Sequence, residues 1–365
     1  MNTPTRAISV GLIGCGWVTQ HWHVPALKRV PDIRVLAVTD PRETEARRVA
    51  AQFGSKICRS AEEVVAHPGI DAVAICVPPA LHVPIALSAM AAGKGVFIEK
   101  PLALSHEEAK TLSEQAALMH VTAVVGYNLR WHPSVRRIKA AVEAGELGDV
   151  LLVRSLFTNR VYREPELPDW RRRRSEGGGV LHDLAAHHVD LWRFLFSAEV
   201  VDINAIAVDG AGEDETAAIT ARLTNGSVIS AAFCAGTADA QELDICGTRG
   251  RLRFSCYSAQ GPVWHPIGAA GLRNQLRLLG RRLRTVPAEI AAWCGRGDML
   301  ESYRAQWSHV GRCIRGEETS RCTLEDGRRA LDIVMAALAS VDARHHPIPH
   351  RQPNEGVPYV DTART

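Results

Sequence analysis

The sequence predicts an α/β fold: an N-terminal doubly wound parallel sheet, followed by an α+β domain with a large, mainly antiparallel open sheet. Over the first 125 residues, nearly continuous Val, Ile and Ala runs alternate with helix-like segments, as they do when helices cover both faces of a parallel sheet. After residue 126, strand-like pieces follow one another across short turns, which is typical of antiparallel pairing. We expect domains over 1–126 and 127–345 and an extended tail over 346–365.

The elements follow from these changes of period. Strands are expected over residues 7–14, 33–40, 71–77, 95–99 and 122–127, with helices over 17–30, 43–53, 81–92 and 105–119. In the second domain we expect helices over 134–144, 180–196, 272–293, 299–315 and 325–343, and strands over 149–157, 200–208, 215–223, 227–234, 240–246 and 250–255. The basic amphipathic segment 272–284 is expected to pack on the sheet or on a partner subunit rather than on a membrane.

Length and composition are those of an ordinary globular protein. The 365 residues suffice for two domains, and 46% of them are hydrophobic against 23% charged. A net charge of +3 is too small to favour nucleic acid or an anionic membrane. The sequence has no apolar run of about 18 residues and no signal-peptide pattern. We therefore expect a cytoplasmic protein that binds a small molecule, with neither nucleic acid nor a membrane as a partner.

The cysteines and histidines do not form a metal-binding pattern. The nine cysteines are odd in number, irregularly spaced and without a CxxC pair. Small buried thiols in a reducing compartment explain them better than disulfides or zinc ligands. The histidine doublets at 187–188 and 345–346 lack partners at metal-ligand spacing. We expect no metal.

One predicted helix carries polar residues inside an apolar run. Residues 177–196 read GGGVLHDLAAHHVDLWRFLF, and at about 100° per residue Asp183, His187 and Asp190 share one face beside an apolar stripe. A helix with one solvated face would give the same pattern. We expect Asp190 to have a structural role, as a cap or in a salt bridge.

A glycine-rich loop follows the first predicted strand. Gly14 and Gly16 stand where the strand meets a helix, so that the backbone can approach a pyrophosphate at the helix N-terminus. Asp40 ends the second strand, 24 residues beyond Gly16, and suits the ribose hydroxyls. Together they indicate a Rossmann dinucleotide-binding domain with NAD as cofactor, although Arg42 leaves NADP possible. Thr19 replaces the third glycine of GxGxxG, which predicts a slightly looser contact between helix and strand.

A third motif lies between this loop and the polar helix. The strand over 95–99 leads into FIEKPLALS, so that Glu99 and Lys100 stand at the carboxyl edge where such sheets bind ligands. In this order, the glycine loop, Glu-Lys-Pro and GGGxxxDxxxHxxD resemble the glucose–fructose oxidoreductase, inositol dehydrogenase and rhizopine-catabolism family, called Gfo/Idh/MocA. The resemblance extends over nearly the whole chain, including GYNLRWHPSVRRIKAAVEAGELGDV and ICGTRGRLRF.

The resemblance implies an NAD(P)-dependent oxidoreductase that moves a hydride between nicotinamide and a secondary hydroxyl or ketone of a sugar, cyclitol or derivative. Lys100 matches the family's active-site lysine, Asp183 its motif aspartate and His187 its acid/base histidine. A histidine ordinarily titrates near neutral pH and suits a proton shuttle. A lysine ammonium can stabilise a developing alkoxide.

The resemblance also implies two binding sites and an assembly. The cofactor is expected to contact Gly14, Cys15, Gly16, Trp17, Val18, Asp40, Arg42, Val77, Pro78, Pro79, His82, Glu99 and Lys100. The substrate is expected to meet Tyr127, Asn128, Arg130, Trp170, Arg171, Asp183 and His187. Family members generally cover the open sheet by oligomerising, which predicts a homodimer or homotetramer through the C-terminal sheet.

Three alternatives stay open at this point. A catalytically silent dinucleotide-binding sensor would keep the same fold, although it would not need Lys100, Asp183 and His187 together. A reductase of another unsaturated group, such as an imine, could use the same scaffold. The run WRRRR at 170–174 also leaves an anionic substrate, such as a sugar phosphate, possible.

Overall fold

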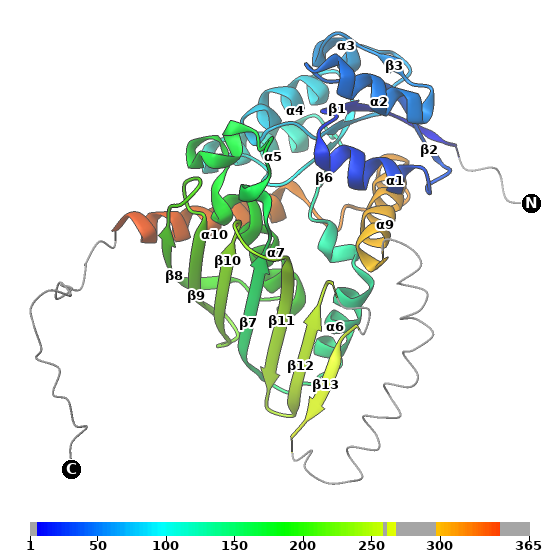
Figure 1. Ribbon diagram of the computed structural model, residues 1–365. Helices are drawn as coiled ribbons and strands as arrows, with labels where there is room; N and C mark the ends of the chain where they lie inside the picture. Colours follow the sequence, from blue (N-terminus) through cyan, green and yellow to red (C-terminus); the bar gives the residue numbers. More distant parts are fainter. Residues whose placement is uncertain (1–5, 258–260, 268–296, 344–365) are drawn as a thin grey trace, which may run out of the picture.

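The structure, a computed structural model, describes residues 6–257, 261–267 and 297–343. Within them the chain forms two sheets, a smaller N-terminal one and a larger one beside it (Figure 1). The helix expected over 272–293 and the tail expected over 346–365 lie outside the described residues. No helix in the described part combines the length and the apolarity needed to cross a bilayer.

The N-terminal sheet is parallel and has the strand order β3-β2-β1-β4-β5-β6. Its strands are β1 Ile8–Ile13, β2 Ile33–Thr39, β3 Lys56–Ile57, β4 Ala72–Ile75, β5 Gly95–Ile98 and β6 Ala123–Val125. Helices α2 Glu43–Phe53, α3 Ala61–Val65, α4 His82–Ala91 and α5 His106–Leu118 connect them. The strand order reverses between β1 and β4, so their carboxyl ends form the crevice at which such sheets bind ligands. This is the predicted Rossmann-type domain.

The second sheet has the order β13-β12-β11-β7-β10-β9-β8 and is mixed. Its strands are β7 Val150–Thr158, β8 Val200–Val208, β9 Thr216–Leu223, β10 Val228–Cys234, β11 Ala240–Gly247, β12 Gly250–Ser255 and β13 Val263–Pro266. All neighbouring pairs are antiparallel except β7 and β10, which run parallel. A helix and two strands separate β7 from β10 in the chain, so no hairpin forces them to run in opposite directions. The prediction of a mainly antiparallel sheet is confirmed.

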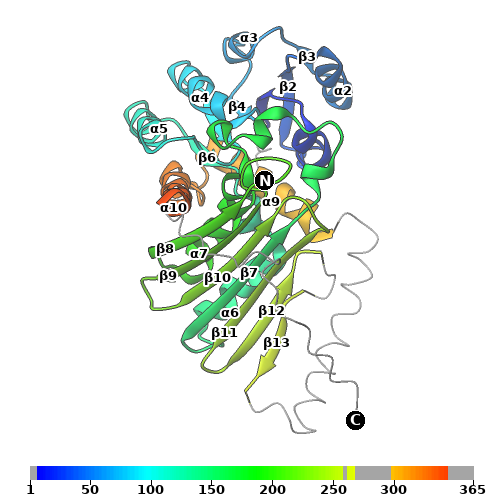
Figure 2. The same ribbon diagram turned by 60° about the vertical axis from the view of Figure 1, so that its left-hand side comes forward.

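Among the described residues, helices cover only one face of the second sheet. Helices α6 Pro133–Glu143, α7 Ala186–Phe196 and α10 Leu324–Ala343 lie behind it (Figures 1 and 2). Along β9, every second residue is buried and the residues between are exposed, which is the period of a strand with one dry and one wet face. The opposite face, over which no described helix lies, is called the open face below.

Both helices that begin at the predicted site contain a π turn. The helix expected over 17–30 contains η1 Thr19–His23 before α1 Val24–Leu27, and the helix expected over 180–196 begins with η7 Leu181–Ala185 before α7. A π turn accommodates one residue more than an α turn and recurs at functional sites. The side chains that follow each π turn therefore point in directions that a regular period of 3.6 does not predict.

The remaining predicted elements are present within a few residues of their expected bounds. Helix α9 Gly297–Ile314 packs against η1, α1 and the short η3 turn Asn128–Trp131, and so joins the two halves. The sequence interpretation did not include β3, α3 and β13. These elements have two, five and four residues, which is too short for a hydrophobic period to be recognised.

Candidate active site

The glycine loop leaves β1 at the carboxyl edge of the sheet. Gly14 has φ +96°, and a Cβ there would lie 2.3 Å from the carbonyl oxygen of Cys76 at the end of β4. A side chain would therefore force β1 and β4 apart. At Gly16, by contrast, a Cβ would come near only the Arg42 guanidinium, at 4.0 Å. The space over Gly16 is open, and a glycine there lets a ligand approach the backbone.

Asp40 stands beside this loop at the end of β2. Its side chain is 7% exposed and accepts hydrogen bonds from the backbone N–H groups of Cys15, at 2.8 Å, and Arg42, at 2.9 Å. Each carboxylate oxygen has further acceptor capacity, which suits ribose hydroxyls. The glycine cradle, the adjacent helix start and this carboxylate therefore fit a dinucleotide. Trp17, 61% exposed, and Val18 lie directly after the loop.

Thr19 makes a contact that the sequence interpretation missed. Its hydroxyl is buried and donates to the carbonyl of Gly14 at 2.8 Å. The bond fastens η1 to the loop. The looser contact expected from the missing third glycine is therefore replaced by a direct hydrogen bond.

The loop after β4 contains Val77, Pro78 and Pro79, and His82 holds it in place. The imidazole of His82 is fully buried, with Nε2 2.9 Å from the carbonyl oxygen of Val77 and Nδ1 2.8 Å from that of Pro101. Burial lowers the pKa of His82 although the two carbonyls oppose that shift. Its ring therefore bridges two loops of the cofactor edge and faces protein on both sides.

Lys100 and Asp183 meet across the two halves of the chain. Lys100 Nζ donates to Asp183 Oδ1 at 2.6 Å and to the Asp183 backbone carbonyl at 2.8 Å. The other carboxylate oxygen, Oδ2, accepts from Arg171 Nη1 at 2.8 Å. Burial alone would raise the pKa of Asp183, but Lys100 and Arg171 outweigh it and hold that pKa well below its usual range. An ammonium has three N–H donors, so one of Lys100 remains for a ligand.

His187 follows Asp183 by one turn. Its Nδ1 is buried without a hydrogen-bond partner among the described residues, and its ring meets those of Tyr127 and Phe157 at 6.4 and 6.0 Å between centroids. Burial, and then the nearby Lys100 ammonium, lower the pKa of His187 well below the ordinary value of a histidine. The imidazole is therefore neutral near pH 7 and able to accept a proton.

The residues expected to meet the substrate fall into two groups. Arg171 is half-buried and binds Asp183, and its guanidinium lies 5.1 Å from the ring centroid of the half-buried Trp170. Asn128 and Arg130 are buried and already have partners: Asn128 donates to Ser302 Oγ at 2.9 Å. The structure brings the first group to the candidate site together with Asp183 and His187. The side chains of the second group, Asn128 and Arg130, instead face the protein interior.

Arg130 instead forms a buried ion pair with Asp190. Its Nη2 and Nε lie 2.6 and 2.8 Å from the Asp190 carboxylate, and its Nη1 donates to the carbonyl of Arg321 at 2.7 Å. Both side chains are almost fully buried. The structural role predicted for Asp190 is thus confirmed as a salt bridge.

Tyr162 is a contributor that the sequence interpretation did not name. Its hydroxyl donates to the carbonyl of Arg171 at 2.7 Å and accepts from the backbone N–H of Gly179 at 3.1 Å. It therefore ties the arginine loop to the glycine run that precedes η7. A lone tyrosine in an irregular segment has no periodicity or motif that could have identified it.

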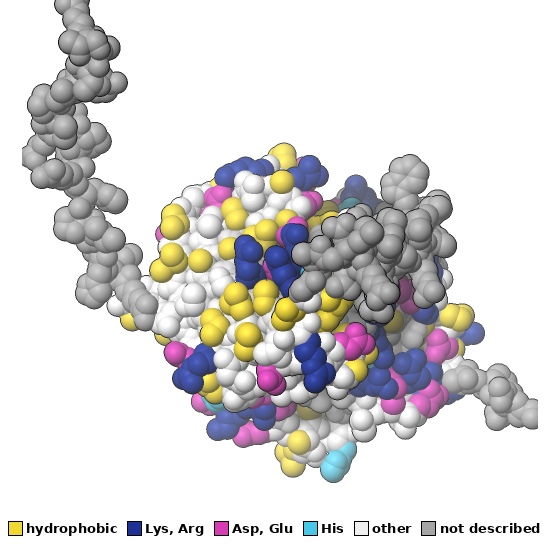
Figure 3. Space-filling model, turned by 90° about the horizontal axis from the view of Figure 1, so that it is seen from below, with side chains coloured by type: hydrophobic (Ala, Val, Ile, Leu, Met, Phe, Trp, Pro, Cys, Tyr) yellow, Lys and Arg dark blue, Asp and Glu magenta, His cyan; other side chains and the backbone are white. Residues whose placement is uncertain are grey.

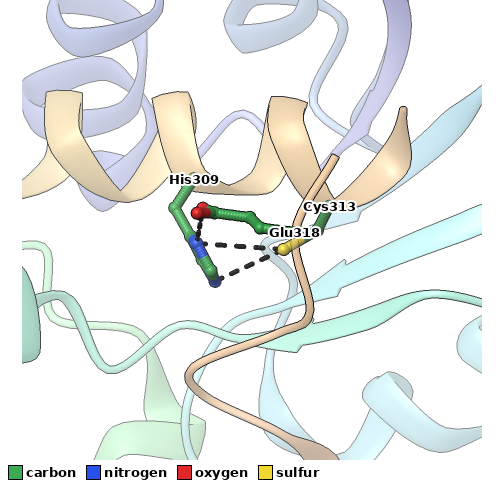
Figure 4. Close-up of side chains that lie close together, drawn as sticks. All are labelled: His309, Cys313 and Glu318. Carbon is green, nitrogen blue, oxygen red and sulfur yellow. Dashed lines mark hydrogen bonds and ion pairs between the residues drawn. The ribbon is translucent and has the colours of Figure 1, made fainter. Parts of the chain in front are cut away.

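A cluster of His309, Cys313 and Glu318 has the residue types of a metal site (Figure 4). His309 Nδ1 contacts Glu318, and its Nε2 accepts from the backbone N–H of Arg321 at 3.0 Å. Arg312 and Arg321 also face the Glu318 carboxylate, at 3.0 and 3.7 Å. These contacts occupy both ring nitrogens, and two guanidinium groups disfavour an added cation. The cluster holds the connection between α9 and α10.

Two family patterns match the sequence. The one described as "Oxidoreductase family, NAD-binding Rossmann fold" matches residues 8–127, and the one described as "GFO/IDH/MocA C-terminal domain" matches residues 135–253. Together they span both halves of the candidate site.

Individual proteins are also similar to this chain. The scyllo-inositol 2-dehydrogenase (NAD(+)) of Bacillus subtilis is 29% identical over 345 residues, which cover 91% of this chain and 94% of that protein. The uncharacterized oxidoreductase YrbE of B. subtilis is 30% identical over 256 residues, 67% of this chain and 73% of that protein. The solved structure of a levoglucosan dehydrogenase in complex with NADH has a TM-score of 0.77 at 24% identity, over 93% of this chain and 98% of that one. That likeness shows a shared fold.

Proposed function

This chain belongs to the Gfo/Idh/MocA family of NAD-binding oxidoreductases, and from that premise we propose its substrate class and its mechanism. The proposed substrate is a sugar, a cyclitol or a derivative of one, oxidised or reduced at a secondary hydroxyl or ketone. Relatives named for scyllo-inositol and for levoglucosan support this class. The observation that carries the proposal is the Lys100 ammonium, held by Asp183 with one donor left, next to the neutral imidazole of His187.

The three side chains divide the work on the reacting oxygen. The free N–H of Lys100 binds this oxygen and stabilises the negative charge that develops on it. His187 accepts the proton in the direction of oxidation and returns it in the direction of reduction. Asp183 fixes the ammonium of Lys100, and Arg171 fixes Asp183 from the other side. When bound, the nicotinamide supplies only the hydride acceptor or donor.

The binding residues follow from the same placement. For the cofactor we propose the glycine loop with Cys15, Trp17 and Val18, then Asp40, Arg42, the loop over 77–79, Glu99 and Lys100, with His82 supporting the loop from below. For the substrate we propose Trp170, Arg171, Asp183 and His187, with the Tyr127 ring against His187. The Asp40 carboxylate, which two backbone N–H groups hold in place, favours NAD over NADP, because it would repel the negative charge of a 2′-phosphate. We place the boundary between the domains at residues 126 and 127, between β6 and η3.

We also propose that the protein is a homodimer or homotetramer through the open face. On this face Ile206 and Val208 of β8 pair with Ala218 and Thr216 of β9, and Val228 of β10 lies further along the sheet, opposite Arg222. The side chains of Ile206, Val208 and Val228 are 64%, 65% and 46% exposed. Seen from below, hydrophobic side chains gather on the surface between separate charged groups (Figure 3). Light scattering would detect dissociation in Ile206→Asp. The matched control is Leu118→Asp, equally exposed on α5 away from the sheet.

One experiment separates an enzyme from a sensor. The purified protein is mixed with NAD or NADP and with cyclitols, hexoses, amino sugars and sugar phosphates, and the nicotinamide absorbance is followed in both directions. Turnover of one class, lost in His187→Ala while NAD still binds, would support the proposal. Tight NAD binding without turnover across the panel would favour the silent sensor. Turnover of sugar phosphates alone would identify the anionic substrate class.

A further inference from the structure

Glu99 is a buried carboxylate among the proposed cofactor residues, and the catalytic steps above give its charge no role. Its side chain is 12% exposed and comes directly after β5. Oε1 accepts a hydrogen bond from His23 Nε2 at 3.0 Å, and Oε2 accepts one from the backbone N–H of Lys100 at 3.1 Å. Within the described ranges, no lysine or arginine forms an ion pair with Glu99, because the Lys100 ammonium turns to Asp183.

His23 does not neutralise this carboxylate. Trp307 Nε1 donates a hydrogen bond to His23 Nδ1 at 3.1 Å, and an indole N–H is only a donor. Nδ1 must therefore carry a lone pair, so the single proton of a neutral imidazole stays on Nε2 and points at Glu99. Trp307 therefore donates a hydrogen bond to His23, and His23 donates one to Glu99. The Glu99 carboxylate, which accepts the last of them, has no cationic partner among the described residues.

The three side chains come from separate parts of the chain and are fixed by packing. His23 ends η1 and is fully buried, with edge contacts to Phe97 and Tyr303 at 5.6 and 5.1 Å between ring centroids. Trp307 belongs to α9 and is also fully buried. The glycine-loop helix, β5 and α9 thus meet at Glu99, which leaves its carboxylate little freedom to move.

An uncompensated buried carboxylate destabilises a fold unless something else favours it, and such groups concentrate at functional sites. Glu99 stands at the carboxyl edge of the sheet, directly before Lys100. A Cβ on Gly126 would lie 2.9 Å from its carboxyl group, so protein closes one side of it. The oxidised nicotinamide ring carries a positive charge that the reduced ring lacks. A fixed negative charge at this edge distinguishes the two redox forms.

We propose that Glu99 supplies the counter-charge for the oxidised nicotinamide ring, and that His23 and Trp307 are positioning residues that hold its carboxylate. The inference rests on the proposed function only in placing the nicotinamide beside Lys100; it needs no particular substrate. Glu99 then strengthens the binding of NAD⁺ and leaves that of NADH nearly unchanged.

Calorimetric titration of the protein with NAD⁺ and with NADH tests this without turnover. In Glu99→Gln, which keeps the shape and removes the charge, the dissociation constant for NAD⁺ should rise about tenfold relative to that for NADH, since one unit charge acts across a few ångströms of protein. Trp307→Phe removes one N–H donor and should change the same ratio about threefold. Trp192→Phe is the matched control, because Trp192 is as buried and donates to Ser155 Oγ at 2.9 Å.

Variants of His23 separate positioning from packing. His23→Gln keeps a donor for Glu99 and an acceptor for Trp307 and should keep most of the NAD⁺ preference, whereas His23→Leu should lose it as Glu99→Gln does. An unchanged ratio in Glu99→Gln, or an equal loss of affinity for both redox forms, would overturn the proposal. So would a Trp307→Phe that matches Trp192→Phe. If Glu99→Gln does not fold, the His23 and Trp307 variants decide by the same ratio. Failure of the substrate panel would leave this ratio untouched, so the two proposals fail separately.

Discussion

Asp183 and Asp190 lie seven residues apart on one helical segment, and the structure gives them opposite surroundings. Asp183 is 21% exposed and lies between Lys100 and Arg171, whose remaining donors have no hydrogen-bond partner in the part of the chain that the structure describes. Asp190 is 1% exposed and binds Arg130 with both oxygens. The guanidinium of Arg130 has its own partners on the protein side. The same residue type therefore lies in the candidate site at one position and in a buried salt bridge at the other.

The difference teaches that the role of a buried carboxylate depends on how many N–H donors of its cationic partner remain for a ligand. The Lys100 ammonium keeps one N–H after binding Asp183. The Arg130 guanidinium is divided between Asp190, the carboxylate of Asp326 and a backbone carbonyl. Asp40 is a third case: two backbone N–H groups bind it at 2.8 and 2.9 Å, and the exposed Arg42 guanidinium lies further away, at 3.7 Å. Each of these three arrangements predicts a different response to substitution.

The largest effect is expected where the cation of Asp183 is removed. Lys100→Met keeps the length of the side chain and should lower kcat about 10³-fold, because the alkoxide loses its charged donor. The unfolding midpoint should change little, and the dissociation constant for NAD should rise by far less than kcat falls, because Lys100 is only one of the proposed cofactor contacts. Steady-state kinetics, calorimetry and thermal unfolding check the three quantities. A kcat within tenfold of wild type would show that Lys100 is not the alkoxide stabiliser.

The comparison itself is tested by the same substitution at both positions. Asp183→Asn should lower kcat about 10²-fold at nearly constant stability, because the amide no longer fixes the ammonium of Lys100. Asp190→Asn should lower the free energy of unfolding by about 3 kcal/mol, because the buried Arg130 loses its bidentate carboxylate and keeps only Asp326, at 3.2 Å, as a charged partner. Denaturant unfolding and kinetics on both variants measure this. Equal stability losses in the two variants would contradict the division of roles.

The pH dependence of oxidation should reveal the lowered pKa of His187. A histidine with a lowered pKa stays neutral further into the acid range. We therefore expect kcat/KM to remain constant as the pH falls below about 6.5, the ordinary pKa of a histidine. It should fall only as His187 takes up a proton at more acid pH. His187→Ala should lose at least about 10²-fold in kcat together with this acid limb. If the acid limb of the pH profile persists in His187→Ala, it reports the titration of a group other than His187.

The smallest effect is expected at Asp40, which backbone donors bind more closely than the Arg42 guanidinium does. Asp40→Ala should raise the dissociation constant for NAD about tenfold, by the loss of hydrogen bonds to ribose, and shift preference toward NADP beside Arg42. Asp71→Ala is the matched control, since Asp71 accepts a backbone N–H from Ser9 at 2.8 Å at the opposite edge of the same sheet. Equal changes in both variants would mean that Asp40 acts on stability alone.

Much of the site was predictable because it lies in local motifs. The glycine loop, Glu-Lys-Pro and the Asp–His segment each place their residues at the end of a strand or the start of a helix, which a sequence period reveals. The roles of Asn128 and Arg130 were not predictable in this way. Whether such side chains face a pocket or a buried partner depends on Ser302 and Asp190, which lie 174 and 60 residues further along the chain.

By itself, the sequence determined the order of strands and helices, the parallel and mainly antiparallel halves, the dinucleotide loop and the residues whose chemistry suits a hydride transfer. These are properties of short segments, where period and turn chemistry act within a few residues. Only the tertiary structure decided which carboxylate meets which cation, which histidine stays neutral, and that Trp307 reaches His23 and Glu99. Charges and hydrogen bonds act through space over a few ångströms, and the π turns at 19–23 and 181–185 change which neighbours each side chain meets.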